Sequence, residues 1–157
     1  MNILFLCTGN LCRSPMAEAL LKKFASRDGL RELNAKSAGT HAFAGSKSPA
    51  EAQEVASLVG LDLVTHVAQP LASELVEWAD QIAVMSPEHA DFIEMNYPEG
   101  IDKVVELVKY RPGGKPGDTI KDPYGMKLFH YRQYFGELME ALQGYYVQLK
   151  DAHSKFR

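Results

Sequence analysis

Short apolar runs alternate with longer amphipathic segments along this chain. Residues 2–7 read N-I-L-F-L-C, a nearly unbroken apolar run that predicts a strand buried on both faces. From Pro15 to about Gly29, apolar residues recur at helical spacing, and proline suits the first position of a helix. This alternation is typical of β-α-β units, so the pattern predicts an α/β fold with a parallel sheet.

The same alternation continues through the rest of the chain. Further strands are predicted at residues 33–38, 81–85 and 103–108, and further helices at 49–59, 71–79 and 87–95. Between Leu128 and Leu149, apolar residues lie three and four apart, which favours a long helix with one stripe on the core over a coiled coil. We therefore expect a single domain over residues 1–157, a three-layer Rossmann-like fold with four parallel strands and helices on both faces.

Composition and charge narrow the class of protein. The length of 157 residues, with 46% hydrophobic and 24% charged residues, suits one compact domain. A net charge of −3 produces no field that would attract nucleic acid or anionic lipid, so we expect neither as a partner. The sequence has no signal-peptide pattern and no apolar stretch approaching the roughly 18 residues of a membrane span. We therefore expect a cytoplasmic protein.

The chain has only two cysteines, Cys7 and Cys12, five residues apart. A structural disulfide at that spacing would constrain very little of the chain, so a reducing compartment and a reactive thiol fit better. A zinc site is not supported, because the C-x4-C spacing is unusual and no nearby histidine completes four ligands. We expect no metal and no cofactor.

The most informative segment is C-T-G-N-L-C-R-S-P at residues 7–15, a candidate phosphate loop between the first predicted strand and the first predicted helix. A loop that enters a helix at this edge of a parallel sheet directs unpaired backbone N–H groups and the helix dipole at one point. Those donors would also stabilise a thiolate at Cys7. Arg13, six residues later, can fold back over the sulfur, and its planar guanidinium matches two phosphate oxygens. We therefore predict Cys7 as a nucleophile and Arg13 as a phosphate clamp.

The other residues of this loop are candidate substrate-binding residues. Gly9 allows close backbone approach, and Asn10 tolerates a left-handed conformation. Ser14 can donate a hydrogen bond to the Cys7 sulfur and help it to leave. The predicted substrate-binding positions of the loop are Thr8, Gly9, Asn10, Leu11, Cys12 and Ser14.

Four segments in order resemble the low-molecular-weight protein tyrosine phosphatase family, and the resemblance covers almost the whole chain. They are C-T-G-N-L-C-R-S-P-M-A-E from residue 7, S-A-G-T at 37–40, G-L-D-L at 60–63 with His66, and D-P-Y-G at 122–125. The resemblance implies a metal-independent phosphatase that forms a cysteinyl-phosphate intermediate. Its partners would be phosphorylated proteins or peptides, and its product inorganic phosphate.

The resemblance also implies roles for residues outside the loop. Asp122 would be the general acid toward the leaving group and then the base toward water, with Asp118, four residues upstream, as a rival. In the family, the loop asparagine, here Asn10, is held by two serines and a histidine, which correspond to Ser14, Ser37 and His66. Cys12 could form a disulfide with Cys7 that protects the nucleophile from further oxidation.

Substrate specificity leaves several alternatives open. Phe43 and Tyr124 are expected to wall a slot for a flat ring, with Leu11 as an apolar flank, so we expect phosphotyrosine to be preferred. The main alternative is a protein arginine phosphatase, a subgroup that typically has threonine at the position of Leu11. Two further alternatives are disfavoured. An arsenate reductase would need cysteines after Cys12, and a phosphopeptide-binding module would not need intact Cys7, Arg13 and Asp122.

Overall fold

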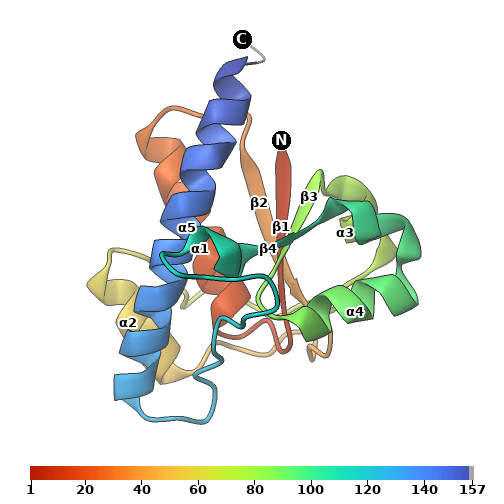
Figure 1. The fold of residues 1–157 in the computed structure, drawn as a ribbon. Helices are drawn as coiled ribbons and strands as arrows, with labels where there is room; N and C mark the ends of the chain where they lie inside the picture. The colour runs from red at the N-terminus through yellow and green to blue at the C-terminus, as the bar shows by residue number, and fades with distance from the viewer. Residues whose placement is uncertain (156–157) are drawn as a thin grey trace.

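A four-stranded parallel sheet lies at the centre of the computed structural model, which describes residues 1–155 (Figure 1). Its strands are β1 (Asn2–Cys7), β2 (Asn34–Gly39), β3 (Gln81–Val84) and β4 (Val104–Glu106), in the spatial order β2-β1-β3-β4. Every pairing is parallel. The predicted α/β class, strand number and strand direction are confirmed.

Helices cover both faces of the sheet, as predicted. One face carries α1 (Arg13–Arg27), α2 (Ala50–Leu58) and the long α5 (Leu128–Lys155), and the other carries α3 (Ser73–Trp78) and α4 (Pro87–Asn96) (Figure 1). Two short 3-10 helices, η1 (Pro98–Lys103) and η2 (Leu107–Tyr110), flank β4. The sheet is therefore the middle of three layers.

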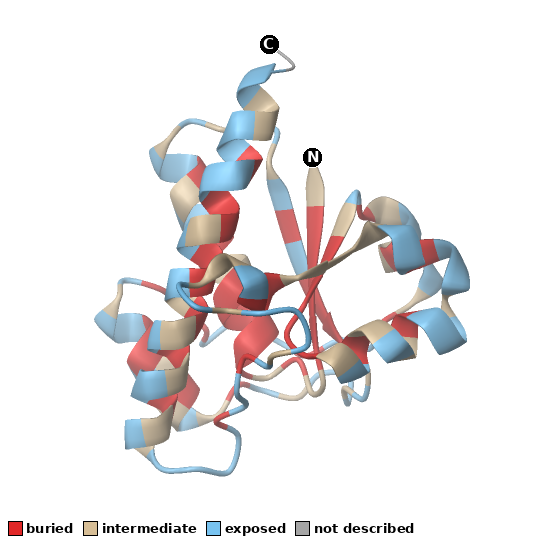
Figure 2. Ribbon diagram, in the orientation of Figure 1, coloured by how far each residue is buried: buried red, intermediate tan, exposed pale blue. Residues whose placement is uncertain are grey.

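The central strand β1 explains why residues 2–7 are apolar almost throughout. Ile3 and Phe5 point into the hydrophobic cluster under α1 and α5, whereas Leu4 and Leu6 point into the cluster under α3 and α4. All four side chains are fully buried, and buried residues concentrate along the strands and the helix faces turned toward them (Figure 2). A strand covered on both faces has no position for a polar side chain.

Several element boundaries differ from those predicted. Helix α1 begins at Arg13, two residues before Pro15, because the Cys12 carbonyl already accepts from the Met16 N–H at 3.2 Å. Strand β4 ends at Glu106 rather than at residue 108, since Leu107 and Val108 turn into the core within η2. Helix α3 is shorter than predicted, and α5 continues six residues beyond Leu149, to Lys155.

The strand order places one edge of the sheet in a position suited to ligands. The chain goes from β1 through α1 to β2 on one side and later returns to β3 on the other side of β1. In open α/β sheets, this change of direction leaves a crevice beyond the carboxyl ends of the strands. The loop after β1 opens into that crevice.

None of the described helices is long and apolar enough to span a bilayer.

Candidate active site

The loop between β1 and α1 is held in place by hydrogen bonds that its carbonyl groups accept from the segment after β2. The Thr40 N–H donates to the Cys7 carbonyl and the His41 N–H donates to the Thr8 carbonyl, both at 2.9 Å. Within residues 1–155, the backbone N–H groups of residues 9–12 have no protein acceptor. Unpaired N–H groups immediately before a helix N-terminus form a site for an anion.

Gly39, at the end of β2, makes this arrangement sterically possible. A Cβ at this position would lie 2.5 Å from the Thr8 carbonyl oxygen and 3.0 Å from the Asn10 nitrogen. Both are backbone atoms of the loop, so any side chain here would displace it. A Cβ at Gly9 would meet only the Leu11 side chain, at an ordinary 3.7 Å. Packing within the protein therefore requires glycine at position 39 and not at position 9. Sequence reasoning missed this requirement at Gly39.

Asn10 organises the interior of the loop and adopts the predicted left-handed conformation, with φ of 54°. Its side-chain amide donates to Ser14 Oγ at 2.8 Å, and its Oδ1 accepts from the Gln69 backbone N–H at 2.9 Å. His66 Nε2 donates to the Asn10 carbonyl at 2.7 Å. Asn10 is fully buried, and with these contacts it holds the loop from below.

One residue of the predicted network around Asn10, Ser37, does not contact Asn10. Ser37 does not bond to Asn10, because its hydroxyl donates to the Glu18 carboxylate. Gln69 takes its place through the backbone N–H and, with its side chain, also donates to the Ser37 carbonyl at 2.8 Å. The assignment of Ser37 was therefore wrong, whereas Ser14 and His66 contact Asn10 as expected.

Ser14 connects this network to the candidate nucleophile. Its Oγ lies 2.9 Å from Cys7 Sγ, and Asn10 already donates to that oxygen. The serine proton is therefore free to point at the sulfur, since the alternative acceptor, the Ala38 carbonyl, is farther away at 3.4 Å. A hydroxyl so oriented stabilises a sulfur anion.

Arg13 is almost fully buried, with 3% of its surface exposed. Its Nη1 donates to the Ile120 carbonyl at 3.0 Å, and its Nη2 contacts Asp122 Oδ2 at 3.3 Å and Thr8 Oγ1 at 3.5 Å. Its Nε is buried without an acceptor among the described residues. A buried guanidinium with an unpaired donor fits a site that receives an anion.

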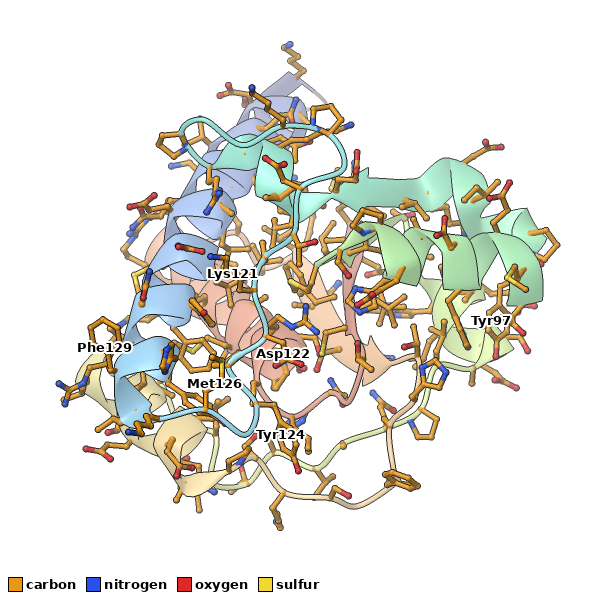
Figure 3. The ribbon with its side chains drawn as sticks, turned by 60° about the horizontal axis from the view of Figure 1, so that its bottom comes forward. Tyr97, Lys121, Asp122, Tyr124, Met126 and Phe129 are labelled. Atoms are coloured by element: carbon orange, nitrogen blue, oxygen red, sulfur yellow. The ribbon has the colours of Figure 1, made fainter. Side chains whose placement is uncertain are left out.

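The segment that carries Asp122 is anchored at both sides of this residue. The Ile120 N–H donates to the Met85 carbonyl at 2.8 Å, and the Tyr124 N–H donates to Asp122 Oδ1 at 3.1 Å. The Asp122 side chain is partly exposed and contacts Arg13. Figure 3 shows Asp122 on the segment that leads to α5, between Lys121 and Tyr124. Asp118 does not line this cavity, and its carboxylate accepts from the Lys115 N–H at 2.9 Å.

A cavity of about 240 Å³ opens above the loop. Nine predicted site residues line it, together with His41 and Ser46, which sequence reasoning missed because they lie in a loop without a recognisable motif. Asn10 and Ser14 lie behind the wall. The lining consists of Cys7, Thr8, Gly9, Leu11, Cys12, Arg13, His41, Phe43, Ser46, Asp122 and Tyr124.

The second cysteine is chemically distinct from the first. Cys12 is buried and unbonded to Cys7, with its Sγ 3.9 Å from the Tyr131 hydroxyl. Burial, reinforced by the negative charge of Asp122, raises the pKa of the Cys12 thiol to about 12. Cys12 is therefore a protonated thiol at neutral pH.

These features define a class of protein. A parallel sheet with an anion-accepting loop after its first strand, and a thiol, a guanidinium and a carboxylate around one cavity, is the architecture of a cysteine-based phosphatase. The comparison with known families agrees, because residues 2–155 match the model of the low molecular weight phosphotyrosine protein phosphatases. The chain belongs to this family.

Individual relatives divide between two specificities. The protein-arginine-phosphatase of Bacillus subtilis (strain 168) is 41% identical over 96% of this chain and 97% of its own length. The low molecular weight protein-tyrosine-phosphatase Ptp of Acinetobacter johnsonii is 36% identical over 90% of each chain. A solved YwlE arginine phosphatase mutant with a phosphorylated active site serine has a TM-score of 0.88 and 39% identity, covering 96% of both chains. The comparisons thus favour the arginine alternative over the expected phosphotyrosine preference.

Proposed function

We propose that this phosphatase removes phosphate from phosphorylated protein side chains through a cysteinyl-phosphate, with phosphotyrosine as the preferred substrate. The Cys7 thiolate attacks phosphorus while Asp122 gives its proton to the departing oxygen. Water, deprotonated by Asp122, then attacks the cysteinyl-phosphate, and Cys7 leaves as a thiolate that accepts the Ser14 hydrogen bond. The phosphorylated active site serine of the YwlE mutant supports a covalent intermediate at this loop.

The side chains in the wall of the cavity support the proposed preference for phosphotyrosine. Leu11 flanks the loop, and Phe43 and Tyr124 stand at the rim with 82% and 60% of their surfaces exposed. Two rings and an aliphatic side chain suit a flat phenyl group.

A guanidinium in the same place would be less well matched. Its N–H groups need acceptors, and Asp122 is the one carboxylate among the lining residues. Leu11 offers no acceptor, so a phosphoarginine would leave donors unpaired at a cost of about 1–3 kcal/mol, or roughly 5- to 150-fold in selectivity.

Phosphoarginine remains the second candidate substrate. It is supported by the 41% identity to the arginine phosphatase of Bacillus subtilis across almost the entire chain. Asp122 could serve this substrate as well, because a carboxylate can bind the guanidinium that it protonates.

One experiment separates the two candidates. The value of kcat/KM is measured for one peptide sequence that carries phosphotyrosine, phosphoarginine or phosphoserine, with Cys7→Ser as the inactive control. We expect phosphotyrosine to be hydrolysed fastest, and Leu11→Thr to shift the preference toward phosphoarginine. Faster hydrolysis of phosphoarginine by the unmodified protein would replace the first proposal with the second.

A further inference from the structure

A fully buried histidine lies behind the phosphate loop and outside the cavity. His89, on α4, has no exposed surface, and its Nε2 lies 2.9 Å from Thr8 Oγ1. Its Nδ1 lies 3.2 Å from Ser86 Oγ, whose hydroxyl is in turn 3.0 Å from Glu88 Oε1. The mechanism above makes no use of this histidine.

The direction of each hydrogen bond follows from its partners. A carboxylate only accepts, so the single Ser86 proton goes to Glu88. Ser86 Oγ must then accept from His89, which places the histidine proton on Nδ1. Burial, with help from Arg13 and His41, lowers the pKa of His89 to about 3, so the ring is neutral. Its Nε2 therefore carries a lone pair and accepts from the Thr8 hydroxyl.

This direction determines what Thr8 offers to Arg13. With its proton committed to His89, Thr8 Oγ1 presents lone pairs to Nη2 of Arg13, 3.5 Å away. The other side-chain contact of that nitrogen is Asp122. When Asp122 turns from Arg13 toward the departing group, the contacts left to the Arg13 side chain among the described residues are those with Ile120 and Thr8.

We propose that His89 is a positioning residue that fixes the Thr8 hydroxyl so that it holds the Arg13 guanidinium over the phosphate during catalysis. The proposal rests on the proposed phosphatase mechanism. His89 touches no reacting atom and acts through Thr8 alone. It therefore supports the stage of the reaction in which the contact between Arg13 and Asp122 is absent.

Substitutions at His89 test this chain of contacts. His89→Leu removes both hydrogen bonds, whereas the amide oxygen of His89→Gln can replace Nε2 as the acceptor of the Thr8 proton. On an aryl phosphate, His89→Leu should lower kcat about tenfold with KM changed less than about threefold, because the lost contact serves the transition state. The kcat of His89→Gln should stay within about threefold of the wild-type value.

A double-mutant cycle shows whether the effect passes through Thr8. Thr8→Val should lower kcat about as much as His89→Leu, and adding His89→Leu to Thr8→Val should cost less than about twofold more. The matched control for general destabilisation is Ile93→Ala, which creates a cavity at another fully buried position of α4. It should lower thermal stability with little loss of kcat.

Several results would overturn the proposal. Additive losses in the double variant would show that His89 does not act through Thr8. An equal loss of kcat in Ile93→Ala would reduce the role of His89 to packing. If His89→Leu does not fold, wild-type rates in Thr8→Val are sufficient to reject the proposal. Inactivity of the wild-type protein would instead contradict the proposed function, so the two failures are distinguishable.

Discussion

Burial of neutral His89 should make the fold sensitive to mild acid. In the unfolded chain a histidine has a pKa near 6.5, whereas in the fold burial lowers the pKa of His89 to about 3. Below pH 6.5 the unfolded state therefore binds a proton that the folded state does not, and stability falls as the pH falls. The loss is at most about 1.4 kcal/mol per pH unit, or about 2 kcal/mol between pH 7 and pH 5.

The groups around His89 leave this direction unchanged. Arg13 and His41 both disfavour the charged ring, whereas the carboxylate of Glu88, whose Oε1 lies 3.8 Å from Nε2, is largely exposed to water. Hydrogen bonds also lower the pKa values of the Asp28 and Glu106 carboxyl groups. Those carboxylates take up protons only below about pH 4.5, so they contribute little between pH 5 and 7.

Urea unfolding at pH 7, 6 and 5 measures the effect in wild type and His89→Gln. Every other titratable group is the same in both proteins, so the difference in unfolding free energy isolates His89. We expect wild type to lose about 2 kcal/mol more than His89→Gln between pH 7 and pH 5. Parallel pH profiles for the two proteins would refute the reasoning and show that His89 is charged, or exposed to water, in the fold.

Three further predictions concern the loop and the acid. Asp122→Asn should slow phosphate esters with poor leaving groups by about 10²–10⁴-fold and good leaving groups less, while Asp118→Asn stays near wild type in steady-state assays. Mild peroxide should inactivate the enzyme at Cys7, and mass spectrometry should find more Cys7–Cys12 disulfide and less sulfinic acid as the pH rises, because the raised pKa of Cys12 limits its thiolate. Gly39→Ala should weaken binding of inorganic phosphate, measured by calorimetry, since its Cβ would meet the Thr8 carbonyl oxygen at 2.5 Å; unchanged affinity would contradict this.

The parts of the fold that the sequence predicts well are those whose pattern is local. The run from Ile3 to Leu6 must be apolar on both faces of a covered sheet, so composition alone identifies β1 as a buried strand. The spacing of Cys7 and Arg13 likewise lies within one loop. The C-terminal end of α5 and the short β4 differed from the prediction. Leu107 and Val108 are apolar because they are buried within η2, and their apolar character alone does not distinguish that turn from a strand.

The parts of the site that sequence reasoning missed depend on contacts between distant residues. The carbonyl of Ile120 supports Arg13 across 107 positions, and the Gln69 N–H supports Asn10 across 59. Main-chain atoms make both contacts, so no side-chain pattern in the sequence marks them. His89 is 81 positions from Thr8, and a single histidine in an amphipathic helix resembles a surface residue until the fold shows it buried.

Overall sequence identity does not determine substrate preference, because that preference depends on a few side chains. Identity of 41% is averaged over 150 positions, most of which build the sheet, the helices and the common phosphate loop. A preference for phenyl over guanidinium is set by the few side chains that touch the leaving group, and one unpaired donor is worth about 1–3 kcal/mol. Leu11 lines the cavity directly, whereas the residues that hold the loop, Asn10 and Ser14, do not. We therefore expect that a single substitution at position 11 changes the preferred substrate while leaving the fold and the phosphate-binding chemistry intact.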